Sequence, residues 1–102
     1  MPTSLTNEEF SQHLNTKFRV KLETAGPIEL ELVEVKGYAS KPEEQRGMER
    51  FSVFFQGPEN GFLPQHAYSV EHDLMGAFDI FLVPIARDEK SVRYEAVFNY
   101  FK

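Results

Sequence analysis

Residues 76–85, GAFDIFLVPI, decide the fold that this sequence predicts. Side chains alternate between the two faces of a β-strand. From Ile80 onward both faces of this segment carry apolar residues, which indicates a central strand that is covered on both sides. Pro84 has no backbone N–H, so strand pairing is expected to weaken near the end of the segment.

The rest of the chain supplies five further strands. Apolar and polar residues alternate, with turn residues between the segments, in residues 17–23, 28–36, 50–56, 67–72 and 92–101. Short strands at regular spacing, without a βαβ pattern, predict an all-β fold. We expect a small six-stranded antiparallel barrel or sandwich, formed by one domain over residues 1–102.

Residues 17–23 and 28–36 are predicted to form a hairpin with complementary charges on its wet face. Cations such as Lys17 and Arg19 alternate with apolar residues in the first segment, and Glu29 and Glu31 do so in the second. The alternation then slips at Leu32-Val33, which predicts a β-bulge.

One short helix is predicted over residues 5–14. Thr6 and Glu9 have the spacing of a capping box, which satisfies two free backbone N–H groups at a helix start. Phe10 and Leu14 lie one turn apart and form a narrow apolar stripe. We therefore expect this N-terminal helix to pack on the barrel or sandwich through that stripe.

A second apolar face is predicted on three strands, opposite the main core. Such a patch favours aggregation when it is left in water. The stripe of the helix is favoured as its cover, and a homodimer or partner interface is the alternative. The residues of this face are Phe54, Phe81, Val83, Val97 and Phe101.

Two connections are candidates for recognition, because loops on a rigid β scaffold commonly bind partners. One is the polar connection over residues 37–49, and the other is the apolar turn at residues 62–64. The alternative for this turn is a structural plug in the barrel end, slightly favoured for Leu63. The candidate interaction residues are Tyr38, Phe62, Leu63, Gln65 and His66.

No constellation of residues indicates catalysis, a metal site or a cofactor. His66, Glu71, His72 and Asp73 are the one cluster of ligating types, but alternation points Glu71 away from His72 and leaves the ligand set incomplete. The glycines stand singly, without a phosphate-binding loop, and the chain has no cysteine. We predict no catalytic residues, no metal and no cofactor.

The charge balance and the chain termini limit the classes of partner and location. A formal net charge of −5 repels nucleic acid and anionic membranes, so neither is expected as a partner. The first residues lack a signal-peptide pattern, and no apolar run has the length of a membrane span. We expect a soluble cytoplasmic protein.

Six sequence segments resemble an uncharacterised bacterial family, a domain of unknown function similar to DUF6916. They are LTNEEF, ELELVEV, FSVFFQGP, FLPQHAYSVEH, LMGAFDIFLVPIARD and RYEAVFN. The resemblance implies a fold but no activity, and it implies an association with proteins similar to phage-tail collars. Where the resemblance leads us to expect a Gly after Pro-Gln, this chain has His66-Ala67.

These observations favour a non-enzymatic protein-interaction or accessory module. The sequence does not identify its protein partner, and it also allows a homodimer. The alternative is a barrel that binds a small apolar ligand in its aromatic interior, although six short strands enclose little volume. An enzyme is kept only as a residual hypothesis.

Overall fold

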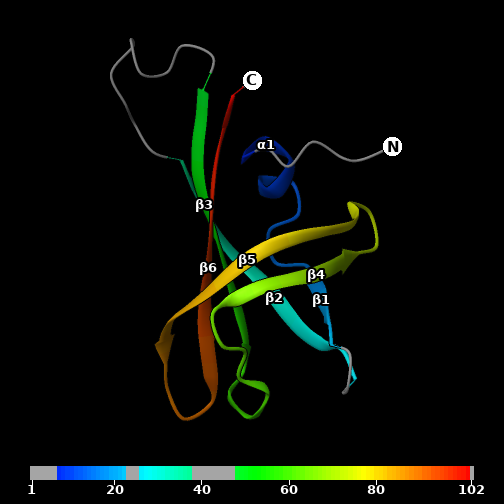
Figure 1. The fold of residues 1–102 in the computed structure, drawn as a ribbon, viewed down its shortest axis with the longest axis vertical. Coiled ribbons are helices and arrows are strands. Elements are labelled where there is room, and N and C mark those ends of the chain that lie inside the picture. Colours follow the sequence, from blue (N-terminus) through cyan, green and yellow to red (C-terminus); the bar gives the residue numbers. More distant parts are fainter. Residues whose placement is uncertain (1–6, 23–25, 38–47, 102) are drawn as a thin grey trace.

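A computed structural model of the chain describes residues 7–22, 26–37 and 48–101. A short helix precedes six strands, and a single turn of 3-10 helix connects the third and fourth strands (Figure 1). The elements are α1 (Asn7–Ser11), β1 (Lys17–Lys21), β2 (Ile28–Gly37), β3 (Met48–Pro58), η1 (Glu59–Gly61), β4 (His66–His72), β5 (Gly76–Arg87) and β6 (Ser91–Phe101).

The six strands close into an antiparallel barrel in the order β1-β2-β3-β6-β5-β4. The barrel closes where β1 pairs with β4, with Val20 opposite Val70. This topology confirms the predicted all-β fold and decides between the two predicted forms in favour of the barrel. A closed barrel has no free edge along its paired wall, which is a common solution for a small all-β domain.

The interior holds the apolar side chains that the alternation predicted. In β1, Phe18 and Val20 are buried while the cations between them are not. The hairpin charges are confirmed too, because Lys17 pairs with Glu31 at 3.6 Å across β1 and β2. The register shift between Leu32 and Glu34 confirms the predicted irregularity in β2.

The prediction that both faces of β5 are covered is wrong for the outer face. Ile80 and Leu82 are buried inside the barrel, but the Phe81 side chain is 51% exposed and Ile85 is 45% exposed. The barrel wall is a single layer, so burial of the inward side chains leaves the outward ones without a second layer. The effect expected of Pro84 is confirmed, since the β5–β6 register shifts between Pro84 and Ala86.

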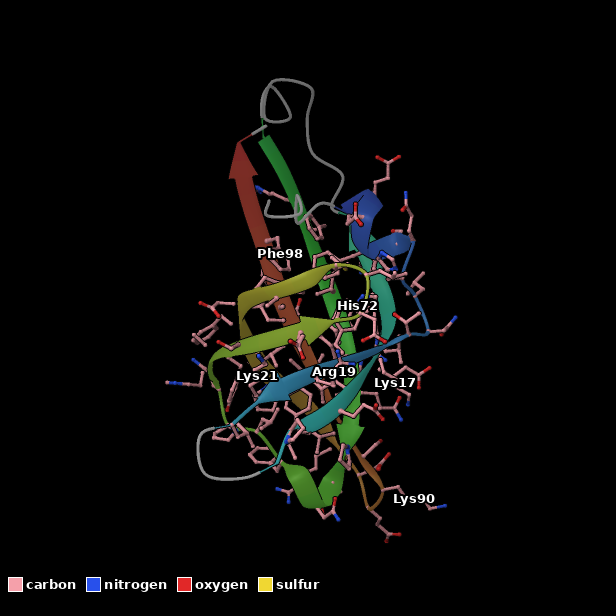
Figure 2. The ribbon with its side chains drawn as sticks, turned by 90° about the vertical axis from the view of Figure 1, so that its right-hand side faces the viewer. Lys17, Arg19, Lys21, His72, Lys90 and Phe98 are labelled. Carbon is pink, nitrogen blue, oxygen red and sulfur yellow. The ribbon has the colours of Figure 1, made fainter. Side chains whose placement is uncertain are left out.

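The pairing of β5 with β6 is short, and the barrel wall divides beyond it. These strands pair only from Val83↔Glu95 to Arg87↔Val92, whereas β3 and β6 pair along their full lengths. The far half of β6 therefore leaves β5 and continues with β3 as a two-stranded arm that extends past β4 and β5 (Figures 1 and 2).

The α1 segment closes the barrel where β5 and β6 separate. The Phe10 ring is fully buried, with its centroid 5.3 Å from that of Phe98 and 6.0 Å from those of Phe51 and Phe78. The predicted docking of Phe10 on the second apolar face is therefore wrong, because these partners belong to the barrel interior. A ring of that size gains more contact area in the open end than on a convex wall.

The helix itself is shorter than predicted, ending at Ser11, and Thr6 of the predicted capping box lies outside the described residues. A turn follows, and Asn15 adopts a positive φ of 68°. The Asn15 N–H donates to the Leu32 carbonyl at 2.7 Å, and the Leu32 N–H donates to the Thr16 carbonyl at 3.1 Å. These bonds fix the turn to β2 and so hold Phe10 in place.

Replacement of Phe10 tests its role as a filler of the barrel end. Phe10→Ala is expected to lower the free energy of unfolding by about 3–5 kcal/mol, the usual cost of deleting a buried ring. Urea unfolding followed by circular dichroism measures this loss. Leu14→Ala, on the same stripe but 37% exposed, is the control and is expected to cost about 1 kcal/mol or less. Equal losses for the two variants would contradict this role.

Candidate interaction surface

The outer wall over β3, β6 and β5 carries the predicted second apolar face. The strand register places Val83 opposite Glu95 and Glu95 opposite Phe54, so these three side chains share the outer face. Val97 lies two residues further along β6 and Phe81 two residues back along β5, on the same face. The Phe101 side chain lies outside the described part of the structure.

Exposure on this face is concentrated on β5 and β6. Val97 is 64% exposed and Phe81 is 51% exposed, while Val83 is half-buried. We call Phe81, Val83 and Val97 the outer patch. Both exposed side chains lie just beyond the last paired position of the two strands, where the wall divides.

Phe54, on β3, does not extend the outer patch in the same way. The guanidinium carbon of Arg93 lies 4.9 Å from the centroid of the Phe54 ring, and Arg93 forms an ion pair with Glu34. The Ser52 hydroxyl donates to the Glu95 carboxylate at 2.7 Å on the same face. Polar groups therefore cover the β3 side of the face, and the apolar surface open to solvent lies on β5 and β6.

The turn at residues 62–64 lies at the other end of the barrel, away from the division of the wall. Leu63 is buried, and its N–H donates to the Tyr94 hydroxyl at 2.8 Å. The Tyr68 hydroxyl donates to the Pro64 carbonyl at 2.5 Å. Leu63 therefore fills the end of the barrel, as the alternative prediction for this turn stated. Its side chain is not available to a partner.

The other candidate residues near this turn differ in exposure and in contacts. Phe62 is 39% exposed, and the Arg87 guanidinium lies 4.7 Å from its ring centroid. Gln65 and His66 are exposed, with the His66 ring edge-on to Tyr68 at 5.4 Å. Tyr38 lies outside the described residues. The other four candidates do not form one exposed surface, because Leu63 is buried.

His72, one of the four residues in the cluster of ligating types, forms a buried polar site whose partners the sequence did not reveal. Its Nδ1 accepts hydrogen bonds from the Leu74 N–H at 3.0 Å and the Met75 N–H at 3.1 Å. The ring proton is therefore on Nε2, 2.9 Å from the Thr16 hydroxyl oxygen, and that hydroxyl donates to the His13 carbonyl at 2.6 Å. This chain of bonds joins the β4–β5 turn to the segment that carries Phe10.

The surroundings of His72 favour its neutral form. Burial lowers its pKa from the ordinary 6.5, and the nearby His13, whose ring centroid is 4.7 Å away, lowers it further. His13 is distant in sequence and gives no pattern with His72, so only the fold reveals the pair. Among the described residues, no group of three or more His, Cys, Asp or Glu is placed to hold a metal ion.

The cations of β1 are engaged with carboxylates along one side of the barrel. Arg19 lies 2.8 Å from the Asp73 carboxylate and 3.5 Å from that of Glu71, and Lys21 lies 3.4 Å from Glu71. Lys17, Arg19 and Lys21 are labelled in Figure 2. The hydrogen bond to Asp73 raises the pKa of Arg19. This row of paired charges does not form a basic surface for phosphates.

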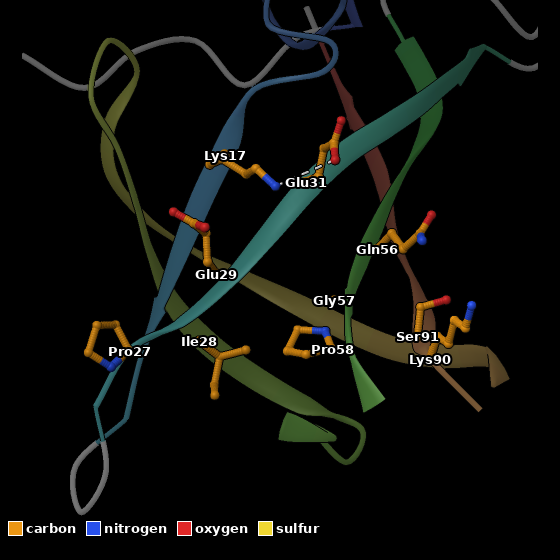
Figure 3. Close-up of a pocket in the computed structure, with 10 residues that line it drawn as sticks. All are labelled: Lys17, Pro27, Ile28, Glu29, Glu31, Gln56, Gly57, Pro58, Lys90 and Ser91. Atoms are coloured by element: carbon orange, nitrogen blue, oxygen red, sulfur yellow. Dashed lines mark ion pairs between the residues drawn. The ribbon is translucent and has the colours of Figure 1, made fainter. Parts of the chain in front are cut away.

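A shallow groove of about 460 Å³ lies on the outer side of β2 and β3 (Figure 3). Its charges are mixed, since Lys17, Glu29 and Glu31 line the β1–β2 side and Lys90 lies beside Ser91 on the opposite side (Figure 3). Lys17 is also paired with Glu31. Gly57 lines the groove, and a Cβ there would lie 2.4 Å from a Leu30 methyl carbon, so a larger residue would require the buried Leu30 side chain to shift. The groove therefore does not converge on one ligand charge or one reacting group.

Fold and surface together define this protein as a small six-stranded antiparallel β-barrel domain with an exposed apolar patch on its outer wall. The family model described as Domain of unknown function (DUF6916) matches residues 5–98, and the chain belongs to this family. Comparison with curated proteins and with solved structures finds no match. Among the described residues, no helix has both the length and the apolar character needed to cross a membrane.

The buried His72 predicts a pH dependence of stability. Below pH 6.5 the unfolded chain takes up a proton that the native ring still excludes, so the free energy of unfolding falls as the pH is lowered toward the native pKa. We expect the ring protons of His72 to titrate in NMR with a midpoint below 6.5, and we expect His72→Gln to reduce the slope of stability with pH. His66→Gln controls for the loss of a histidine from β4. A His72 midpoint at or above 6.5 would contradict the proposed neutral site.

Proposed function

We propose that this protein is a non-enzymatic protein-interaction module whose partner docks on the outer patch. The observation that carries the proposal is the solvent exposure of Phe81 and Val97 on β5 and β6, next to the last paired position of these two strands. Aromatic and branched side chains held on a barrel wall lose little conformational freedom on binding, and aromatic residues are frequent anchors of interfaces.

The polar neighbours of the outer patch support a docking surface. Arg93 and Glu34 are paired beside it, and Glu95 accepts the Ser52 hydrogen bond within the same face. An apolar centre with a polar rim is the usual composition of a non-obligate protein interface. A patch of this kind is also an aggregation liability in a protein that has no partner for it.

The alternative, a barrel that holds a small apolar ligand, has less support. The interior positions are occupied by large buried side chains, among them Phe18, Phe55 and Tyr94. Leu63 fills one barrel end and Phe10 the other. Side chains normally fill barrels of this strand number, so an internal ligand would require several of these residues to move.

The chemistry of the described residues also supports a non-enzymatic role. His72 uses both ring nitrogens in hydrogen bonds that hold the fold, and the carboxylates near β1 are paired with cations. The net charge of −5 makes protein a better class of partner than nucleic acid or an anionic membrane. We propose a cytoplasmic location, with proteins of phage-tail-like assemblies as the first partners to test.

Substitution of Phe81 tests the proposal. Phe81→Ser is expected to reduce partner capture from native lysate about fivefold or more, because loss of an anchoring aromatic side chain costs about 1 kcal/mol of binding or more. Capture is measured by quantitative mass spectrometry with the wild-type chain as reference. Thermal unfolding of the variant is expected to match that of the wild type, since Phe81 lies on the outside.

Leu74→Ser is the matched control, because Leu74 is an apolar residue in the β4–β5 turn and is 78% exposed. Phe62→Ser tests the separate hypothesis that the turn at residues 62–64 binds the partner. Identical partner lists for the wild type and Phe81→Ser would remove the outer patch as the docking site. Loss of capture in Phe62→Ser alone would place the site at the barrel end instead.

A further inference from the structure

The far half of β6 presents an open strand edge. Residues 96–101 pair with β3 on one side, from Val53↔Ala96 to Met48↔Phe101. On the other side, β5 pairs with β6 only as far as Glu95, and no other described strand pairs there. The barrel is therefore closed over its lower part, and within the described ranges one edge of the β3–β6 arm has no strand partner. The arm extends past β4 and β5 in Figures 1 and 2.

Over the described residues, this edge carries a regular row of backbone hydrogen-bonding groups that have no strand partner. In an antiparallel ladder, alternate residues direct both their N–H and C=O groups to the same neighbouring strand. Half of the residues in the segment 96–101 therefore direct both groups away from β3. The chemistry that fits such a row is another extended strand, which supplies the matching donors and acceptors at the same spacing.

The sequence of this edge lacks the features that protect edge strands. Residues 96–101 read AVFNYF, with no charge, no proline and no glycine. Charged residues, prolines and bulges are the usual means by which proteins prevent edge pairing. The facing edge of β5 differs, since it contains Gly76 and the charged Asp79, whose carboxylate accepts the Ser69 hydroxyl at 2.8 Å. The β6 edge is therefore the one suited to pairing.

We propose that the open edge of β6 pairs antiparallel with the same edge of a second copy of this chain, across a two-fold axis. This proposal deepens the proposed function, because it names a second copy as a partner at the border of the outer patch. The two β3–β6 arms would then form one continuous sheet. Val97 of each copy, 64% exposed in the single chain, would be covered by the neighbouring strand.

The charge distribution supports a second copy as the occupant. Two-fold pairing places identical segments opposite each other, so any charge in the segment would face its own equivalent or a near neighbour. Residues 96–101 carry none, although the whole chain has a net charge of −5. The net charges of the two copies still repel each other, but this repulsion is long-range and is screened by salt. Added salt is therefore expected to strengthen the dimer.

Sedimentation velocity over a range of protein concentrations tests this proposal. The wild-type chain is expected to reach twice the 11.8 kDa mass of the single chain at high concentration. Val97→Lys places a charge beside the edge and is expected to shift the protein to monomer without lowering its melting temperature, since Val97 is exposed. Leu74→Lys adds the same charge at an exposed turn and is expected to leave the dimer intact.

Single cysteines locate the contact, because the natural chain has none. Each of residues 96–101 is replaced by cysteine in turn, with Leu74→Cys as the control. Residues at the two-fold axis face their equivalents at a separation that a disulfide can bridge, so cross-linking is expected to peak at one position and fall on either side. The backbone amides of the same segment are expected to gain protection from hydrogen exchange as concentration rises.

The outcomes separate this proposal from the proposed function. A wild-type chain that is monomeric at every concentration overturns the edge pairing, as does a dimer that survives Val97→Lys or cross-links equally at Leu74→Cys. Partner capture that depends on Phe81 would still support the outer patch in those cases. Loss of the dimer in Val97→Lys, together with a cross-linking maximum within residues 96–101, supports the edge pairing. This holds even where Phe81→Ser captures the same proteins as the wild type.

Discussion

The structure depends on how one aromatic ring fills the place where the barrel wall divides. The strands β5 and β6 pair over only four positions, from Val83↔Glu95 to Arg87↔Val92, and then separate. Separation exposes the inner faces of both strands, including Phe78 and Phe98. Phe10 lies against both rings and is fully buried, so a side chain from the N-terminal segment replaces the missing wall. The His72 hydrogen bonds and the Asn15–Leu32 contact hold the segment that carries it.

The strands could be predicted from the sequence because their alternation has a local cause. Each inward position must be apolar, and each outward position on a single-layered wall can be polar. This rule located all six strands, the hairpin charge pair between Lys17 and Glu31, and the irregularities near Leu32 and Pro84. Barrel closure through β1 and β4 is not local, and the sequence left it open between a barrel and a sandwich.

The wrong predictions about the outer face and its cover share one physical cause. The alternation of apolar and polar residues does not show where two paired strands separate. Two apolar faces on residues 80–85 suggested a second layer, and an apolar stripe on the helix suggested that the helix supplied it. The structure instead uses Phe10 inside the barrel and leaves Phe81 and Val97 in solvent. The turn at residues 62–64 shows a second limit of the residue pattern. Leu63 and Phe62 are adjacent in sequence, and only the fold shows that Leu63 alone points inward. No local signal connects His13 with His72.

The division of the wall also explains why the outer patch and the open edge lie together. If β5 continued along β6 beyond Glu95, residues 96–101 would be paired with it, and a ring at position 10 would have no space between the two strands. Divergence therefore creates the space for Phe10 and also leaves backbone groups of β6 without a partner among the described strands. A fold that only needed stability could close this gap with further pairing. Retention of an uncharged edge beside exposed Phe81 and Val97 is instead consistent with a surface that is completed by another chain.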